Sequence, residues 1–267
     1  MATYGFIGTG NMGGALAKAV CRTVSPDEVF LTNRTMEKAR VLAETLNCQV
    51  ADNEAIAQSA DFIFLGVKPQ MMAELMAEIA PILSKRETRF VLVTMAAGLT
   101  VSNIQDMAGE KYPVIRIMPN TPCSIGMGMT LYACGAEVED GEKKTFLADM
   151  AGAGKFAELP EHLIDAGSAV SGCGPAFVDL FLEALADGGV ACGLPRATAM
   201  ILASQMVIGS AMLQQDSSVH PGVLKDAVCS PGGTTIQGVR TLEQNGFRAA
   251  VMDAVIAAYD KTLALKK

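Results

Sequence analysis

A glycine pattern near the first residue is the part of this sequence best suited to bind a ligand. A short apolar run over residues 3–7 leads into Gly8-x-Gly10-x-x-Gly13. In this spacing the first glycine permits a tight turn, the second lets a pyrophosphate approach the backbone, and the third lets a helix pack against the strand. Glycine-rich turns without a ligand share the motif. Here strand, glycines and helix follow in the order that dinucleotide binding requires, and we therefore predict such a site.

The residues after the second predicted strand indicate which dinucleotide would bind. NAD-selective folds usually place Asp or Glu there, to bind the ribose 2′-hydroxyl. This chain has Asn33-Arg34-Thr35 instead, with Lys38 one turn further on. The Arg34 guanidinium could clamp a 2′-phosphate, and Asn33 could add a hydrogen bond. An ordinary exposed arginine at a helix start would look the same. The pattern favours NADP(H), with NAD(H) as the second choice.

Three further loops follow strands of the same predicted sheet. They contain Val67-Lys68-Pro69, Ala96-Ala97-Gly98, and Asn120 within Pro119–Pro122. Parallel strands deliver the loops at their carboxyl ends to one edge of the sheet, so all three should face the cofactor. Lys68 is explained equally well as a cofactor contact or as a solvated loop lysine.

A second glycine-rich helix start lies far along the chain, at Ser230-Pro231-Gly232-Gly233-Thr234-Thr235. Successive backbone N–H groups in such a turn can form a nest for a small anion, for example a carboxylate. The Thr235 hydroxyl could then donate to, or accept from, a neighbouring substrate atom. A plain capped turn has the same spacing, and from the residues alone both interpretations stay open.

The first 160 residues alternate between strand and helix patterns, which predicts an α/β fold with a doubly wound, Rossmann-like sheet. The predicted strands cover residues 4–7, 29–33, 49–51, 62–67, 90–94 and 114–118, with edge strands at 130–133 and 155–158. The predicted helices cover residues 12–22, 36–46, 54–59, 70–82, 101–108 and 142–151. The central strands are continuously apolar, as expected where helices cover both faces.

Beyond His162 only helix patterns remain, over residues 177–191, 196–215, 221–230, 235–245 and 247–265. We therefore predict two domains: a dinucleotide-binding domain over 1–162 and an all-α domain over 163–267. Two of these helices are apolar nearly all round. A domain of about 100 residues cannot cover them alone, and we expect a second subunit to do so in an interlocked homodimer.

Composition excludes several classes of partner. The formal charge of −7 and the sequence pI of about 4.9 argue against nucleic acid and anionic membrane surfaces. Seven cysteines without a CxxC pair, and only two histidines, predict reduced thiols and no metal site. The uncharged stretch 197–215 contains polar side chains and fits a protein-covered helix better than a membrane span. No basic-then-apolar leader precedes the first strand, and we expect a cytoplasmic protein.

Taken together, these segments resemble the pyrroline-5-carboxylate reductase family over nearly the whole chain. The resemblance is carried by Gly8–Gly13, Val67–Pro69, Ala96–Gly98, Arg116–Pro122, Ser171–Phe177, Ala186–Gly189 with Gly193–Arg196, and Ser230–Thr235. It implies NADPH-dependent reduction of L-1-pyrroline-5-carboxylate to L-proline, the last step of proline biosynthesis. It also implies an intertwined dimer built by the helical domain, with decamers as a further assembly in this family.

The resemblance also implies roles for individual residues. Thr235 matches the threonine whose hydroxyl meets the ring nitrogen, and would be the catalytic residue. The carboxylate cradle would comprise Ser230, Gly232, Gly233, Thr234 and Thr235. The cofactor would be bound by Ile7, Gly8, Gly10, Asn11, Met12, Asn33, Arg34, Asn53, Val67, Lys68, Pro69, Ala96, Ala97, Gly98 and Asn120. Two positions depart from the family pattern: Cys173 replaces a common serine, and Ser218 replaces a glutamate, so no carboxylate role transfers there.

Three other functions fit the sequence less well. β-Hydroxyacid dehydrogenases need a lysine early in the second domain, but none occurs between Lys155 and Lys225, and an imine substrate does not demand it. The segment around Ser171 lacks the flanking glycines of a hydrolase nucleophile elbow. A sensor that binds NADP(H) without turnover would not need a second cradle.

Overall fold

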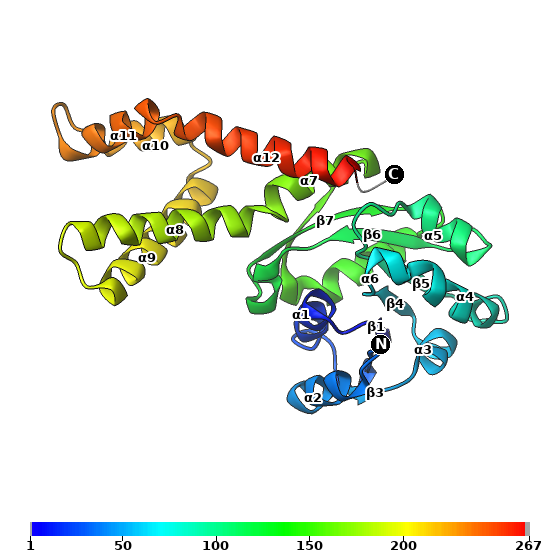
Figure 1. Ribbon diagram of the computed structural model, residues 1–267. Coiled ribbons are helices and arrows are strands. Elements are labelled where there is room, and N and C mark those ends of the chain that lie inside the picture. Colours follow the sequence, from blue (N-terminus) through cyan, green and yellow to red (C-terminus); the bar gives the residue numbers. More distant parts are fainter. Residues whose placement is uncertain (1, 265–267) are drawn as a thin grey trace. The chain divides into compact units, whose positions relative to one another are not determined.

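The computed structural model describes residues 2–264 and divides them into two compact units (Figure 1). The first, which we call the sheet unit, comprises the chain up to Cys173 together with the end of the chain from Ala258. The second, the helical unit, comprises Gly174–Ala257. The predicted domains, residues 1–162 and 163–267, would be parts that fold independently, and this division stays a prediction.

The sheet unit is built on one eight-stranded sheet in the order β3-β2-β1-β4-β5-β6-β7-β8. Its strands are β1 Tyr4–Ile7, β2 Val29–Thr32, β3 Gln49–Val50, β4 Phe62–Leu65, β5 Val91–Thr94, β6 Val114–Met118, β7 Gly128–Cys134 and β8 Gly154–Glu158. The first six are parallel, β7 runs antiparallel to β6, and β8 runs parallel to β7. The strand order reverses between β1 and β4, which is the switch point where doubly wound sheets bind ligands.

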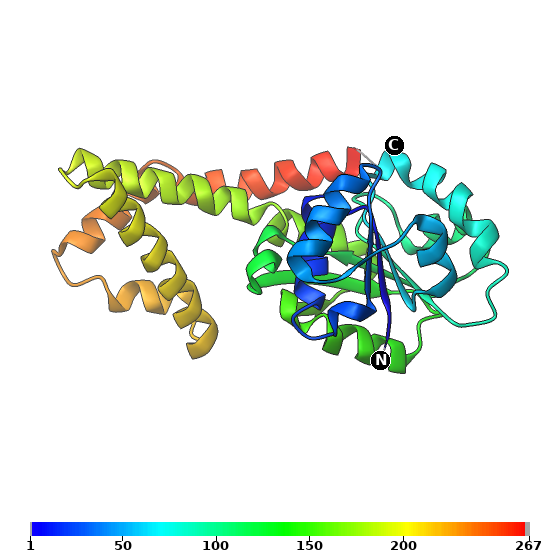
Figure 2. The same cartoon turned by 90° about the horizontal axis from the view of Figure 1, so that it is seen from below.

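Helices cover both faces of this sheet (Figures 1 and 2). They are α1 Asn11–Val20, α2 Met36–Leu46, α3 Asn53–Ser59, α4 Met72–Leu83, α5 Val101–Ala108, α6 Asp140–Asp149 and α7 Ile164–Ser171. Short 3₁₀ turns occupy η1 Pro26–Glu28, η2 Pro69–Met71, η3 Thr121–Ile125, η4 Ala151–Ala153 and η5 Glu161–Leu163.

The apolar strands supply a separate core to each face, because neighbouring side chains on a strand point in opposite directions. Phe6 and Phe64 belong to a cluster with Leu16 of α1 and Phe146 of α6. Their neighbours in sequence, Ile7 and Leu65, belong to a second cluster that packs against α3, α4 and α5. Burial on both faces explains why β1 and β4 read as unbroken apolar runs.

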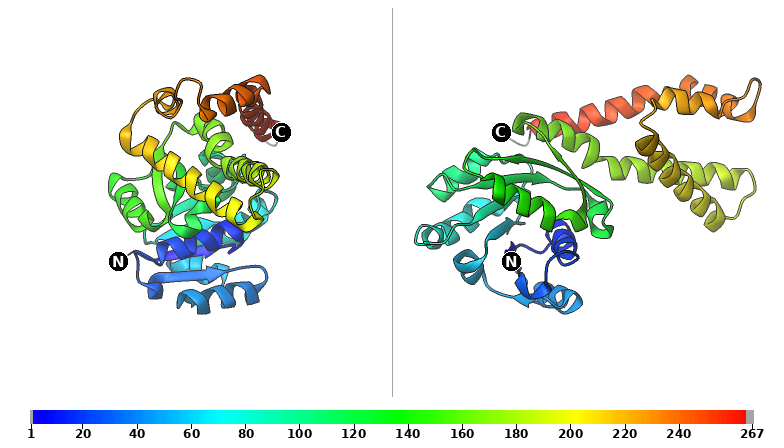
Figure 3. Two further views of the ribbon diagram at one scale, coloured as in Figure 1. Left: turned by 90° about the vertical axis from the view of Figure 1, so that its left-hand side faces the viewer. Right: turned by 180° about the vertical axis from the view of Figure 1, so that it is seen from behind.

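The helical unit contains α-helices and no strand among its described residues (Figure 3). They are α8 Gly174–Ala191, α9 Arg196–Ser217, α10 Pro221–Ala227, α11 Thr234–Gln244 and α12 Phe247–Ala264, and the last turns of α12 belong to the sheet unit. Two described helical stretches, Glu161–Ala191 and Arg196–Ser217, are long and apolar enough to cross a membrane, and only 11% of an apolar 18-residue segment of each is buried. The expectation that no membrane is involved therefore stays a prediction.

The predicted fold class is confirmed, with local corrections. The helix predicted over 70–82 begins as a 3₁₀ turn, because Pro69 starts a tighter turn before Met72. The helix predicted to reach Ser230 ends at Ala227, since residues 228–230 form the turn before the glycines. Helix α7 was not predicted, as its eight residues carry only a weak apolar face. The end predicted at Leu265 lies outside the described residues.

Candidate active site

The three glycines of the first loop are required for different geometric reasons. Gly8 has φ +101°, and a Cβ there would lie 2.7 Å from the carbonyl carbon of Gly66. A Cβ on Gly13 would lie 2.2 Å from the Gly8 carbonyl oxygen. A Cβ on Gly10, in contrast, would meet nothing within 4 Å. Packing therefore demands glycine at positions 8 and 13, whereas position 10 faces open space, which suits a ligand that must touch the backbone.

The start of α1 is prepared for an anion. Gly10 is the N-cap residue, no side chain caps the helix, and no acidic residue lies in its first turn. The first N–H groups of a helix have no partner inside the helix, and the helix dipole is positive at this end. A pyrophosphate seated over Gly10 would satisfy these donors. The residues present fit a dinucleotide.

The glycine loop is tied to the end of β2, which brings the predicted ribose-binding residues beside it. The backbone N–H groups of Gly8 and Thr9 donate to the Thr32 carbonyl, at 3.0 and 3.3 Å. Arg34 follows two residues later and is exposed, with its Nη1 3.9 Å from the Met71 sulfur. Among residues 2–264 no carboxylate forms an ion pair with Arg34. Its charge is thus available to an anionic ligand.

The loops after β4 and β5 share one hollow of about 340 Å³. Its lining includes Pro69 from the first loop and Ala97 and Gly98 from the second, with the rest supplied by Leu99 and by Asn103, Asp106 and Met107 of α5. The structure thus brings together residues that the sequence placed on one sheet edge. Lys68 is exposed beside them, which leaves both of its sequence interpretations open.

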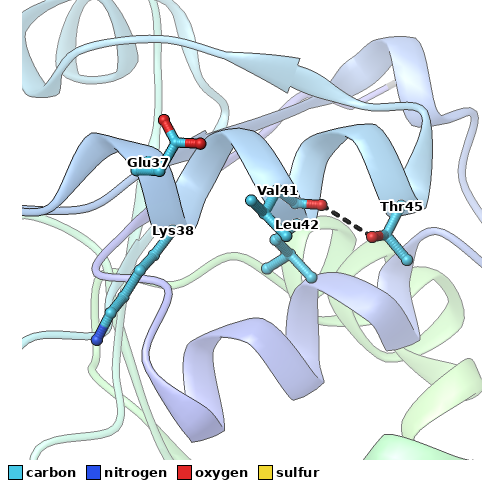
Figure 4. A pocket seen from close by; sticks show the side chains of 5 residues that line it. All are labelled: Glu37, Lys38, Val41, Leu42 and Thr45. Atoms are coloured by element: carbon cyan, nitrogen blue, oxygen red, sulfur yellow. Dashed lines mark hydrogen bonds between the residues drawn. The ribbon is translucent and has the colours of Figure 1, made fainter.

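Another hollow, of about 330 Å³, is lined by side chains of α2 (Figure 4). Glu37, Lys38, Val41, Leu42 and Thr45 line it, and the Glu37 and Lys38 side chains point away from each other. The Thr45 hydroxyl donates to the Val41 carbonyl within the same helix. This surface has no convergent polar groups, so we assign it no function.

Two predicted cofactor residues already have polar partners within the sheet unit. The Asn53 amide N–H group donates to both Glu78 carboxylate oxygens, each at 3.0 Å. The Asn120 amide donates to the Ser171 carbonyl at 3.0 Å and accepts from the Met129 N–H at 2.9 Å. Asn120 therefore holds its own loop in place, and a cofactor contact from either asparagine stays a prediction.

The second glycine-rich turn forms a small cradle within the helical unit. Gly232 has φ +69°, and a Cβ on Gly233 would lie 2.3 Å from the Ser230 hydroxyl oxygen. Gly233 is also the N-cap of α11, which has neither a side-chain cap nor an acidic residue in its first turn. Thr235 is exposed, and its hydroxyl has no hydrogen-bond partner among the described residues. Free N–H groups beside a free hydroxyl suit a small anion with a second polar group.

The seven cysteines form no disulfide among the described residues. Burial raises the pKa of the Cys134 thiol to about 11. A hydrogen bond between the Cys21 and Cys48 thiols raises the pKa of Cys21 and lowers that of Cys48. Within residues 2–264 no group of three or more His, Cys, Asp or Glu side chains is arranged to hold a metal ion.

Sequence reasoning missed one buried cluster. Arg116 of β6 is almost fully buried and pairs with Asp165, at 2.7 Å, and with Glu161, at 3.5 Å. The available signal was the arginine itself, a charge in the middle of the apolar strand Val114–Met118.

The doubly wound sheet with its glycine loop, followed by a helical domain, is the architecture of a nicotinamide-dependent oxidoreductase. Residues 3–98 match the family model "NADP oxidoreductase coenzyme F420-dependent". Residues 161–265 match the model "Pyrroline-5-carboxylate reductase dimerisation".

Full-length relatives give the family. Pyrroline-5-carboxylate reductase of Pisum sativum is 39% identical over 96% of this chain and 93% of its own length. The enzyme of Escherichia coli K12 is 38% identical over 98% of both chains. The solved Plasmodium falciparum pyrroline carboxylate reductase, with NADP bound, is 32% identical with a TM-score of 0.87, over 100% of this chain and 98% of its own. The chain belongs to the pyrroline-5-carboxylate reductase family, and it is an oxidoreductase.

Proposed function

We propose that this protein reduces L-1-pyrroline-5-carboxylate to L-proline with NADPH, the last step of proline biosynthesis. The observation that carries the proposal is the uncapped start of α11, where free N–H groups lie beside the unpartnered Thr235 hydroxyl. A substrate with one carboxylate and one ring nitrogen matches that pair of features. Membership of the reductase family supports the same reaction.

The sheet unit would hold the cofactor, which when bound supplies the hydride. The N–H groups at the start of α1 bind the pyrophosphate, and Gly10 keeps the space above the backbone free. Arg34 binds the 2′-phosphate, which distinguishes NADPH from NADH. The loops containing Pro69 and Ala97 border the remaining length of the dinucleotide.

The helical unit would hold the substrate. The turn of Gly232, Gly233 and Thr234 cradles the carboxylate, and the N–H groups from Thr234 onward bind it, because the Gly233 N–H already donates to the Ser230 carbonyl at 3.0 Å. The Thr235 hydroxyl orients the ring nitrogen. An imine nitrogen is far more basic than a carbonyl oxygen and can be bound already protonated. The chain therefore needs no lysine acid in this domain, and its main contributions are binding and orientation.

We further propose that the protein is a cytoplasmic homodimer, in which a second copy covers the apolar faces of α8 and α9. The exposed side chains there include Leu180, Ile201, Leu202, Met206 and Met212. So many large exposed apolar side chains on two helices are typical of an interaction site. The match of residues 161–265 to a dimerisation model favours a second copy as the occupant over a lipid bilayer. Dimers could assemble further into decamers, and the sedimentation coefficient of the purified protein would distinguish the two assemblies.

The test is a steady-state assay of the purified protein. We expect NADPH oxidation with pyrroline-5-carboxylate, slower oxidation of NADH, and no turnover of a panel of β-keto acids. Turnover of a keto acid in preference to the imine would favour a hydroxyacid dehydrogenase. Tight NADPH binding without imine reduction would identify a sensor instead.

A further inference from the structure

Two of the seven cysteines meet within the sheet unit, apart from the residues assigned to cofactor and substrate. Cys21 caps the carboxyl end of α1, and Cys48 lies between the end of α2 and the start of β3. Both side chains are half-buried and pack against the core cluster that contains Phe6 and Phe64. A hydrogen bond joins the two thiols, with Cys21 as the donor. The two sulfurs are therefore close enough to react with each other.

The topology of the sheet explains why these distant residues meet. Strands β1, β2 and β3 are parallel neighbours, so the helices that connect them lie on one face of the sheet and end on the same side of it. A Cβ on Gly14 of α1 would lie 3.3 Å from the Leu42 side chain of α2, which shows that the two helices are in contact. This contact fixes the helix ends that carry the thiols.

One of the two thiols is open to small molecules. A hollow of about 360 Å³ is lined by Arg40, Ala43, Glu44, Asn47, Cys48 and Val50. Cys21 is not part of this lining, and it packs behind Cys48 against the core. A small molecule that enters the hollow therefore meets the Cys48 sulfur first.

The hydrogen bond gives the two thiols different reactivities. It stabilises Cys48 as a thiolate and lowers its pKa, whereas the role of donor keeps Cys21 protonated and raises its pKa. The thiolate, and not the thiol, attacks a disulfide. Cys48 is thus suited to attack first, with Cys21 beside it to resolve the product. An accessible thiol next to a resolving cysteine is the arrangement found in redox-sensitive sites.

We propose that Cys48 and Cys21 form a reversible modification site for low-molecular-weight disulfides. The Cys48 thiolate attacks one sulfur of the incoming disulfide, forms a mixed disulfide and releases the other half as a thiolate, which takes up a proton. Cys21 then loses its proton to solvent, attacks the Cys48 sulfur and releases the second half. The protein thus gives up two electrons and two protons as it forms the Cys21–Cys48 disulfide, and the incoming disulfide is reduced to two thiols.

The disulfide closes a covalent loop that contains β2, α2 and the exposed Arg34. Such a link restricts the unfolded chain, so the oxidised protein should have a higher thermal midpoint than the reduced one. Neither sulfur belongs to the glycine loop or to the cradle at the start of α11. The modification therefore does not depend on the proposed function.

The test treats the full-length protein with oxidised glutathione at a series of ratios to reduced glutathione. The remaining thiols are then alkylated, and each cysteine is mapped by mass spectrometry. Cys21→Ser and Cys48→Ser each remove one member of the pair. Cys134→Ser is the matched control, because Cys134 is a half-buried thiol of the same unit whose pKa is raised by burial to about 11.

We expect the wild type to form the Cys21–Cys48 disulfide at least about 10-fold faster than Cys134 is modified. A dithiol reductant should reverse the reaction. Cys21→Ser should stop at the mixed disulfide, with glutathione on Cys48, and Cys48→Ser should leave Cys21 unmodified. Both variants should lose the rise in thermal midpoint on oxidation. Cys134→Ser should keep the disulfide and the rise.

Free Cys21 and Cys48 in the folded wild type at the most oxidising ratio would overturn the proposal. So would a glutathione adduct on Cys48 that persists in the wild type, because Cys21 would then not resolve it. If a variant does not fold, the cysteine map of the wild type decides alone. A wild-type protein inactive on the imine would refute the proposed function and leave this result unchanged.

Discussion

The sheet unit buries its large apolar side chains, whereas the helical unit leaves them exposed. In the sheet unit the large apolar side chains of β1, β4 and β5 are buried between two layers of helices. In the helical unit the buried apolar side chains of the described chain are three alanines, Ala186, Ala199 and Ala203. Burying a large apolar side chain contributes about 1.5–3 kcal/mol. The sheet unit thus completes its own core, whereas the large apolar side chains of the helical unit stay exposed, which agrees with the second copy proposed above.

The largest effect should come from a charge placed on the helical surface. Leu202 and Val41 are similarly exposed, at 55% and 56%, in the helical and sheet units respectively. If a second copy covers α9, Leu202→Asp buries an unpaired carboxylate and should yield a monomer without reductase activity. Val41→Asp on α2 should keep the assembly of the wild type. Sedimentation velocity at micromolar concentration checks both. A dimeric Leu202→Asp protein would contradict the proposal that a second copy covers the apolar surface of the helical unit.

Within the sheet unit, substitutions at two glycines of one motif should impair the protein for different reasons. Gly10→Val places its side chain in open space, so the thermal midpoint should hold while the Kd of NADPH rises at least about 10-fold. Gly13→Val drives its Cβ into the Gly8 carbonyl, so the protein itself should be destabilised. Calorimetry with and without NADPH distinguishes the two. Equal loss of stability in both variants would contradict the ligand role of Gly10.

The helical cradle is tested by Thr235→Ala, which removes one exposed hydroxyl. We expect kcat to fall more than about 10-fold, near the low end of the effect of a positioned proton-transfer group. Thr241→Ala is the control on the same helix, because among the described residues its hydroxyl donates to the Gln237 carbonyl alone. Steady-state kinetics with saturating NADPH measure the effect. Full activity of Thr235→Ala would defeat its assignment as the catalytic residue.

A smaller effect is expected at the edge of the cofactor site. Arg34→Ala should raise the KM for NADPH several-fold more than the KM for NADH, since the 2′-phosphate is present only in NADPH. The exposed position of Arg34 keeps the change modest. Parallel titrations with the two cofactors check it, and an equal rise for both would undo the 2′-phosphate argument.

The smallest effect concerns the outer strand β8. A hydrogen bond from Lys143 lowers the pKa of the exposed Glu158 carboxyl. A lowered carboxyl pKa adds stability above its unfolded value, and this stability is lost as pH falls through the folded value. Lys143→Met should therefore cost about 0.2–1 kcal/mol at pH 7, and this cost should shrink as the pH falls through the folded pKa of Glu158. Urea unfolding over a series of acidic pH values measures the change. A cost that stays the same down to the lowest pH would point to lost packing rather than charge.

Local patterns determined much of what could be predicted. The strands of the sheet follow from apolar runs, and the roles of Gly8, Gly10 and Gly13 follow from backbone geometry that depends on neighbours in sequence. The Arg116 cluster could not be predicted, because its partners Glu161 and Asp165 lie more than 40 residues away in the sequence. They reach Arg116 only after the chain has returned along β6 as the antiparallel strand β7. The Asn53–Glu78 contact was missed for the same reason: it joins α3 to α4 across 25 residues.

The close approach of Gly8 and Gly66 limits how this protein can be redesigned. A Cβ on Gly66 would lie 2.3 Å from the Gly8 oxygen, so the two central loops of the crevice touch through bare backbone. If the dinucleotide lies over this loop as proposed, the backbone beneath it offers no side chain to exchange, and neither glycine can be replaced to make room for a different cofactor. Efforts to convert the nucleotide preference would then have to change the exposed Arg34 instead.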